Sequence, residues 1–164
     1  MKAKIFALTL FALVLPVKAS DNFSVYLVRH AEKQKNVDNP SLTKCGEIRA
    51  NQLAIMLNKV GLEKVYSTPY SRTLETAQPV ARYEKISIKQ YSPHSLDQMA
   101  RELKQHGKNV LVVGHSNTTP VLAGLLANET VEPLSEQEYR LIYQVQFVEG
   151  NPSLTVLTHP LACR

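Results

Sequence analysis

Two short apolar runs constrain the fold of this chain more than any other feature of its sequence. The runs are VYLV at 25–28 and VLVV at 110–113, and both are continuous and rich in β-branched residues. Such runs predict strands buried on both faces, as in a parallel sheet covered by helices. Each run ends abruptly in polar side chains: Arg29, His30 and Glu32 follow the first, and His115 follows the second after one glycine.

Strand and helix patterns alternate along the rest of the chain. Helices are predicted over Leu42–Val60, Ser71–Arg82, Ser95–His106 and Pro120–Leu126, and further strands over Lys64–Ser67, Ile86–Ile88, Leu141–Val148 and Leu154–Leu157. The last two strands are expected to form a hairpin around Gly150 and Asn151. This alternation predicts a single α/β domain with a mostly parallel central sheet flanked by helices.

Single residues set the expected ends of these helices. Gly61 and Gly107 are expected to stop the first and third helices, and Ser95 to cap the start of the third. Pro79 is expected to end or kink the second helix, because proline lacks an amide hydrogen. Pro120 stands in the first turn of the fourth helix, where the missing hydrogen costs nothing.

The first nineteen residues have the pattern of a secretory signal. A positively charged start is followed by the apolar run IFALTLFALVLP, which is short for a bilayer span, and then by Ala19 at a position that signal peptidase reads. The prediction is a signal peptide over 1–19 and one domain over 20–164, which is periplasmic or secreted. An uncleaved anchor and an amphipathic first helix are the alternatives.

Removal of that segment changes the charge of the chain. The formal net charge of +5 includes Lys2, Lys4 and Lys18, so the remaining 145 of the 164 residues carry +2. No cluster of basic and aromatic residues remains, so no nucleic-acid partner is predicted. Because the apolar run leaves with the signal, no stable membrane span is predicted after cleavage either. Cys45 and Cys163 also remain, and after export they either form a disulfide or stay as two separate thiols.

Reactive side chains are predicted to gather at one edge of the sheet. Ligands of open α/β sheets bind beyond the carboxyl ends of the strands, and three loops leave such ends. The loops carry Arg29, His30 and Glu32, then Ser67, Thr68 and Arg72, then His115, Ser116 and Asn117. Taken alone, each histidine is more simply a packed residue and each arginine a surface residue. Two arginines, two histidines and a helix N-terminus together predict a site for an anion such as phosphate.

Four motifs, in order along the chain, resemble those of the histidine phosphatase superfamily, which has the phosphoglycerate-mutase-like fold. VRHAEK resembles the catalytic signature, NPSLTKCGEIRA the helix-opening segment, STPYSRTLETA the second-arginine motif and VVGHSNTTP the second-histidine motif. The resemblance covers nearly all of the chain after residue 19, and it is greatest to the short members that lack large insertions.

The resemblance implies a phosphatase that needs neither a metal nor another cofactor. His30 would attack phosphorus to give a phosphohistidine, which water then hydrolyses. Arg29, Arg72 and the catalytic His115, protonated or donating to a phosphoryl oxygen, would bind the phosphoryl group, and Asn117 would also contact it. A neutral imidazole suits the nucleophile, because its second nitrogen can be held by a hydrogen bond to the backbone.

The residue that gives a proton to the leaving group is not evident from the sequence. Many family members carry an acid on an insertion after the third strand, whereas this chain reads QYSPHSLDQMA there. The candidates for this proton donor are Glu32, His94 and Asp97. Of these, Glu32 is expected to be a catalytic residue. A phosphohistidine or an anhydride would need little proton donation. The expected substrate is a phosphorylated small molecule, protein or polysaccharide, and the loops 34–40, 90–97 and 128–138 are expected to select it.

Three other interpretations compete with the phosphatase. GHSNT nearly matches the nucleophile elbow of serine hydrolases, with Ser116 as nucleophile and His159 later in the chain, but Thr118 replaces a glycine and no Gly-rich oxyanion loop precedes it. A metal site built from the two histidines and Glu32 is disfavoured, since the adjacent arginines repel a cation. A module that binds a phosphorylated ligand without turnover stays open.

Overall fold

One six-stranded sheet forms the centre of the computed structural model, which describes residues 22–161. Its strands are β1 (Phe23–Arg29), β2 (Lys64–Ser67), β3 (Ile88–Gln90), β4 (Val110–Gly114), β5 (Leu141–Val148) and β6 (Asn151–Thr158), in the order β3-β2-β4-β1-β5-β6. The first four are parallel, and the β5–β6 hairpin adds two antiparallel strands beside β1. The predicted α/β domain with a mostly parallel sheet is confirmed.

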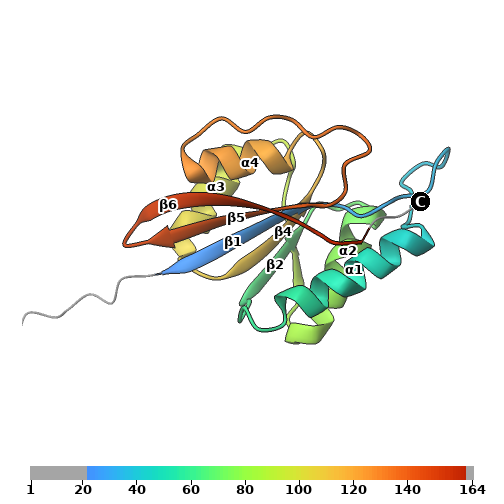
Figure 1. Cartoon of the computed structure of the whole chain (residues 1–164), viewed down its shortest axis with the longest axis horizontal. Coiled ribbons are helices and arrows are strands. Elements are labelled where there is room, and N and C mark those ends of the chain that lie inside the picture. Colours follow the sequence, from blue (N-terminus) through green and yellow to red (C-terminus); the bar gives the residue numbers. More distant parts are fainter. Residues whose placement is uncertain (1–21, 162–164) are drawn as a thin grey trace, which may run out of the picture.

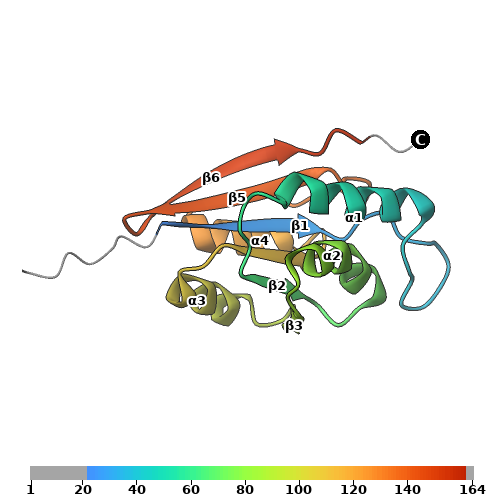
Figure 2. The same ribbon diagram turned by 90° about the horizontal axis from the view of Figure 1, so that it is seen from below.

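Four helices cover the two faces of this sheet. The helices α1 (Lys44–Leu57) and α2 (Ser71–Glu84) lie on one face, and α3 (Leu96–His106) and α4 (Thr119–Ala127) lie on the other (Figures 1 and 2). Alternate residues of β1 divide between the two layers: Leu27 packs with α3 and α4, and Val28 packs with α1 and α2. Burial on both faces accounts for the continuous apolar runs of β1 and β4.

The two central strands bring the predicted reactive loops together. β1 and β4 are parallel neighbours, and Arg29 stands opposite Gly114 in their register. The amide of His30 donates to the carbonyl of Gly114 over 2.9 Å, which extends this pairing by one residue. Because parallel neighbours end at the same edge, the loops that carry His30 and His115 leave the sheet side by side.

The first helix differs from its prediction at both ends. Leu42 pairs with Lys33 in an isolated bridge, so the helix begins at Lys44, and the Thr43 hydroxyl caps it by accepting from the amide of Gly46 over 3.2 Å. It ends at Leu57 rather than at Val60. Gly61, with φ of +69°, therefore does not stop this helix but shapes the loop that carries the buried Leu62 into the core.

The second helix runs through its proline, contrary to one of the two predicted outcomes. α2 continues past Pro79 to Glu84, and Val80 and Ala81 beyond the proline are buried against the sheet. This apolar burial offsets the one hydrogen bond that the proline removes. The helix ends at Lys85, which is left-handed with φ of 58°.

Smaller differences concern the next strand, a cap and the terminal turn. β3 begins at Ile88, two residues later than predicted. Ser95 precedes α3 as expected, but its side chain makes no capping hydrogen bond, whereas Gly107 ends this helix in the left-handed conformation as predicted. The turn of the hairpin is formed by Glu149 and Gly150, with φ of 52° and 82°, so β6 begins earlier than expected.

Two expectations fall on residues outside the described range. The predicted signal peptide over 1–19 is one, and Cys163 is the other. Cys45, in the first turn of α1, is not a free thiol, and its pairing with Cys163 stays a prediction. Between residues 22 and 161, no helix has the length and apolar character that a membrane crossing requires.

Candidate active site

His30 is fixed in one tautomer directly after β1. The side chain is buried, and its Nδ1 lies 2.8 Å from the carbonyl oxygen of Ala31. A carbonyl oxygen only accepts, so Nδ1 carries the hydrogen and Nε2 keeps a free lone pair. The pKa of His30 is lowered to about 3, mainly by burial and to a smaller extent by the positive charges of Arg29 and Arg72, while the bond to Ala31 opposes the shift. The imidazole is therefore neutral at neutral pH and suited to act as a nucleophile.

The second histidine faces the first across a short gap. The ring centroids of His30 and His115 are 5.6 Å apart. On His115, Nε2 lies 3.0 Å from Thr68 Oγ1, and Nδ1 lies 3.4 Å from Nη2 of Arg72. A guanidinium only donates, so Nδ1 accepts and Nε2 donates to Thr68, whose own hydroxyl donates to Thr73. Burial, together with the two nearby arginines, lowers the pKa of His115 to about 4.

Arg29 connects the first loop to a distant segment between α4 and β5. Its Nη1 donates to the carbonyls of Ser135 and Glu138 over 3.0 and 3.1 Å, and its Nη2 donates to Oε2 of Glu136 over 2.9 Å. The guanidinium also stacks on the ring of Tyr139, 4.3 Å from its centroid. The arginine thus organises the segment 135–139 above the end of β1.

Arg72 enters the site from the first turn of α2. Its guanidinium lies 4.7 Å from the ring centroid of Tyr70, and its Nη2 contacts His115 as described above. The Nε atoms of Arg72 and Arg29 are both buried, and neither has a hydrogen-bond partner within the described part of the chain. Two arginines with unused donors beside two neutral histidines form a site that is suited to a phosphoryl group.

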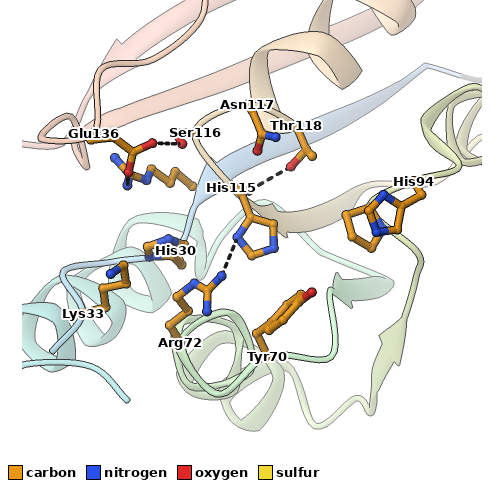
Figure 3. A pocket seen from close by; sticks show the side chains of 12 residues that line it. His30, Lys33, Tyr70, Arg72, His94, His115, Ser116, Asn117, Thr118 and Glu136 are labelled. Atoms are coloured by element: carbon orange, nitrogen blue, oxygen red, sulfur yellow. Dashed lines mark hydrogen bonds and ion pairs between the residues drawn. The ribbon is translucent and has the colours of Figure 1, made fainter. Parts of the chain in front are cut away.

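A cavity of about 340 Å³ opens between these elements (Figure 3). It is lined by the side chains of Arg29, His30, Lys33, Tyr70, Arg72, Pro93, His94, His115, Ser116, Asn117, Thr118 and Glu136. Of the site residues predicted from the sequence, the structure brings together His30, His115, Arg29, Arg72 and Asn117. Figure 3 shows the side chains of Arg72, Tyr70 and the two histidines pointing into the same space.

Glu32 does not reach this cavity. Its carboxylate accepts from Nε of Arg49 over 2.9 Å and from Nη2 of the same arginine, which turns it toward α1. Burial would raise the pKa of Glu32, but the hydrogen bonds and charge of Arg49 outweigh it and leave the pKa below its ordinary value. The Glu32 carboxylate is thus paired with α1 and does not line the cavity that the two histidines share.

Of the other two candidates for the proton donor, one lines the cavity and the other does not. His94 is exposed and lines the cavity, on the side opposite Lys33 (Figure 3). Asp97 is exposed in the first turn of α3 and does not line the cavity.

The two rival sites find little support in the geometry. The Ser116 hydroxyl donates to Oε1 of Glu136 over 2.6 Å, while His159 is buried away from it and its Nδ1 lies 3.3 Å from Nη1 of Arg49. Ser116 is therefore not served by the histidine that a serine hydrolase of this chain order would use. Within residues 22–161, no three histidine, cysteine or acidic side chains are grouped so that they could hold a metal ion.

The sequence interpretation missed three lining residues, Lys33, Tyr70 and Glu136, and Glu136 is the acidic one among them. It lies 107 residues from Arg29, in a polar loop that was expected only to affect substrate selection. The hydrogen bond from Ser116 and the charge of Arg29 hold the pKa of Glu136 below its ordinary value, despite partial burial. No local pattern marks this glutamate among the acidic residues of the 128–138 loop, because its importance follows from where the loop folds.

Comparisons with known proteins point to one superfamily and one fold. The sequence model of the histidine phosphatase superfamily (branch 1) matches residues 25–92, which include His30 and Arg72. The protein histidine phosphatase SixA, solved with tungstate, is similar with a TM-score of 0.68 and 22% identity, covering 82% of this chain and 96% of its own. No curated protein sequence matches this chain.

Two further solved structures share the fold at similar identity. YhfR from Bacillus stearothermophilus has a TM-score of 0.65 and 21% identity, and the match covers 85% of this chain and 98% of that one. A phosphoserine phosphatase from Entamoeba histolytica, solved with 3-phosphoglyceric acid, has a TM-score of 0.60 and 19% identity, with coverage of 85% and 98%. These likenesses establish the fold, and the match of the sequence model supports the histidine phosphatase superfamily.

Proposed function

We propose that this protein is a metal-independent histidine phosphatase that acts through a phosphohistidine on His30. One observation carries the proposal: a buried, neutral His30 keeps the lone pair of Nε2 free beside two arginines and His115. A neutral imidazole in a cationic cavity is the arrangement that attack on a bound phosphoryl group requires.

In the proposed reaction the phosphoryl group lies between the arginines and His115. Arg29 and Arg72 both line this space, and their guanidinium groups supply the positive charge that phosphoryl oxygens require. A bound phosphate dianion favours a proton on Nδ1 of His115, because its charge opposes the effect of the two arginines. His30 Nε2 then bonds to phosphorus as the bond to the leaving group breaks, and water hydrolyses the phosphohistidine in a second step.

The proposed substrate class carries a leaving group of low basicity. Neither Glu32 nor Asp97 lines the cavity, so no carboxylic acid predicted from the sequence is placed to protonate an alkoxide. Aryl and acyl phosphates react without such help, and a phosphohistidine does so once the second nitrogen of its ring carries a proton, so that neutral imidazole leaves. Because SixA is named as a protein histidine phosphatase, a phosphohistidine on a protein is the first natural substrate to test.

The test is detection of the phosphoenzyme by intact mass. Purified protein is mixed with a chromogenic aryl phosphate without added metal, and the reaction is quenched in denaturant at neutral to alkaline pH. We expect one added phosphoryl group in the wild type and none in His30→Ala, with turnover reduced at least about 1,000-fold. His106→Ala, at the exposed end of α3, is the matched control. Ligand binding without an adduct or turnover would instead identify a binding module.

We also propose that the protein is exported and loses residues 1–19. The charged start, the apolar run and Ala19 support this. Mass spectrometry of protein recovered from a bacterial periplasm should give a chain that begins at Ser20. A chain that keeps Met1 would contradict the proposal.

A further inference from the structure

The exposed carboxylate of Glu136 is held over the cavity by two groups of the proposed site. Its Oε1 accepts from the hydroxyl of Ser116 over 2.6 Å, and its Oε2 accepts from Nη2 of Arg29 over 2.9 Å. The side chain of Glu136 is 76% exposed, whereas that of Arg29 is 2% exposed. In Figure 3 the carboxylate lies beside Ser116, across the cavity from Arg72. A buried arginine thus holds an exposed carboxylate at the edge of the cavity.

The segment that carries Glu136 is fixed from both sides of this residue. Nη1 of Arg29 donates to the carbonyls of Ser135 and Glu138, and the Arg29 guanidinium stacks on Tyr139. The arginine that is proposed to bind phosphate therefore also sets the backbone on either side of Glu136. A side chain positioned by a ligand-binding arginine will stay within reach of the ligand.

We propose that Glu136 is a catalytic residue, the general base for hydrolysis of the phosphohistidine on His30. This inference rests on the proposed function and assigns its second step. The oxygen of a water molecule bonds to phosphorus while the N–P bond breaks, and the electron pair of that bond returns to Nε2 of His30. One proton of the water passes to the Glu136 carboxylate, which later releases it to solvent. The products are inorganic phosphate and neutral His30.

Among the charged side chains that line the cavity in the described part of the chain, only Glu136 can accept a proton. It is the only carboxylate among the described residues that line the cavity. The ammonium of Lys33 and the guanidinium of Arg72 have no acceptor atom, and Glu32 is bound to Arg49. The pKa of Glu136 lies below its ordinary value, mainly because of the hydrogen bond from Ser116, so the carboxylate is ionised at neutral pH, as a base must be.

The experiment measures the two chemical steps separately in Glu136→Gln. Wild type and variant are mixed with an aryl phosphate in a rapid-quench instrument, and the aryl alcohol and the phosphoenzyme are followed over time. We expect the variant to release about one aryl alcohol per enzyme at the wild-type rate and then to stall. Its phosphohistidine should hydrolyse about 100-fold more slowly than that of the wild type. Glu132→Gln, in the same loop but outside the cavity lining, should behave as wild type.

Three results would overturn the assignment. Hydrolysis at the wild-type rate in Glu136→Gln would remove the base role, and faster turnover with tighter binding of inorganic phosphate would make Glu136 a competitor for the anion site. Accumulation of the phosphoenzyme in His94→Gln but not in Glu136→Gln would assign the base to His94. A wild type that forms no phosphoenzyme would overturn the proposed function together with this inference, so the two failures are distinguishable.

Discussion

Two arginine–glutamate pairs flank the first loop, and they differ in how far the carboxylate is buried. In the pair of Arg49 and Glu32, the two side chains are 6% and 17% exposed. In the pair of Arg29 and Glu136, they are 2% and 76% exposed. Both arginines are buried, but only the second pair presents its carboxylate to solvent.

The partners of each pair explain what this difference means. Arg49 joins Glu32 to the end of the chain, through the carbonyl of Leu161 and the ring of His159. These contacts lie within the fold, so we expect the pair of Arg49 and Glu32 to stabilise it. Arg29 instead holds a loop whose carboxylate faces the cavity, so we expect its loss to affect catalysis first. The pair with the buried acid is thus expected to stabilise the fold, and the pair with the exposed acid to affect catalysis. Distance from the nucleophile in sequence does not make this distinction.

The largest effect on stability should follow removal of the internal pair. Arg49→Met keeps most of the side-chain volume but leaves the Glu32 carboxylate without its partner. Because an uncompensated buried charge is costly, the free energy of unfolding should fall by about 3 kcal/mol in urea denaturation. Arg82→Met, at an exposed position near the end of α2, is the control and should change it by less than about 0.5 kcal/mol. Equal losses in the two variants would mean that the internal pair contributes nothing specific.

Substitution by lysine, which keeps the positive charge, should lower activity at Arg29 but not at Arg49. A lysine at 29 cannot donate at once to two carbonyls, a carboxylate and a phosphoryl group, so Arg29→Lys should lower kcat/KM for an aryl phosphate about 100-fold. Arg49→Lys should leave kcat/KM within about threefold at a temperature where both variants are folded. A comparable loss in Arg49→Lys would show that the internal pair also positions the reacting groups.

The smallest effect should appear when the pH dependence of the free energy of unfolding is compared between variants of Glu32 and Glu136. The folded-state pKa of Glu32 is below its ordinary value of 4.5, so its ionisation favours folding above pH 4.5, and this contribution disappears as the pH falls through the folded-state pKa. Glu32→Gln should thus be about 2 kcal/mol less stable than wild type at pH 7. That difference should shrink below pH 4.5.

Glu136→Gln is the matched variant for this measurement. In the wild type the pKa of Glu136 is also lowered, but solvent screens this exposed carboxylate. The free energy of unfolding of the variant should therefore differ from wild type by less than about 0.5 kcal/mol at any pH. Thermal unfolding from pH 3 to pH 7 compares the two variants. An equal dependence on pH would contradict the distinction between the internal and the exposed carboxylate.

Much of the site followed from local sequence because the residues concerned stand next to buried strands. The apolar runs before His30 and His115 predicted two strands whose ends meet, and β1 and β4 are indeed parallel neighbours. Arg29 and Arg72 were expected beside them for the same reason. The ends of elements were predicted less well: Gly61 and Pro79 have strong local preferences, yet packing of the helices against the sheet decided where α1 and α2 end.

The sequence by itself determined which residues stand at the ends of the central strands, because alternation of apolar runs with helical patterns is a local property of the chain. Only the tertiary structure decided which glutamate faces the cavity. Glu32 is two residues from His30, but it turns to Arg49 on α1. Glu136 is far away in sequence, and the α4–β5 loop brings it to Arg29. That choice depends on long-range hydrogen bonds to a buried guanidinium, which no local pattern encodes.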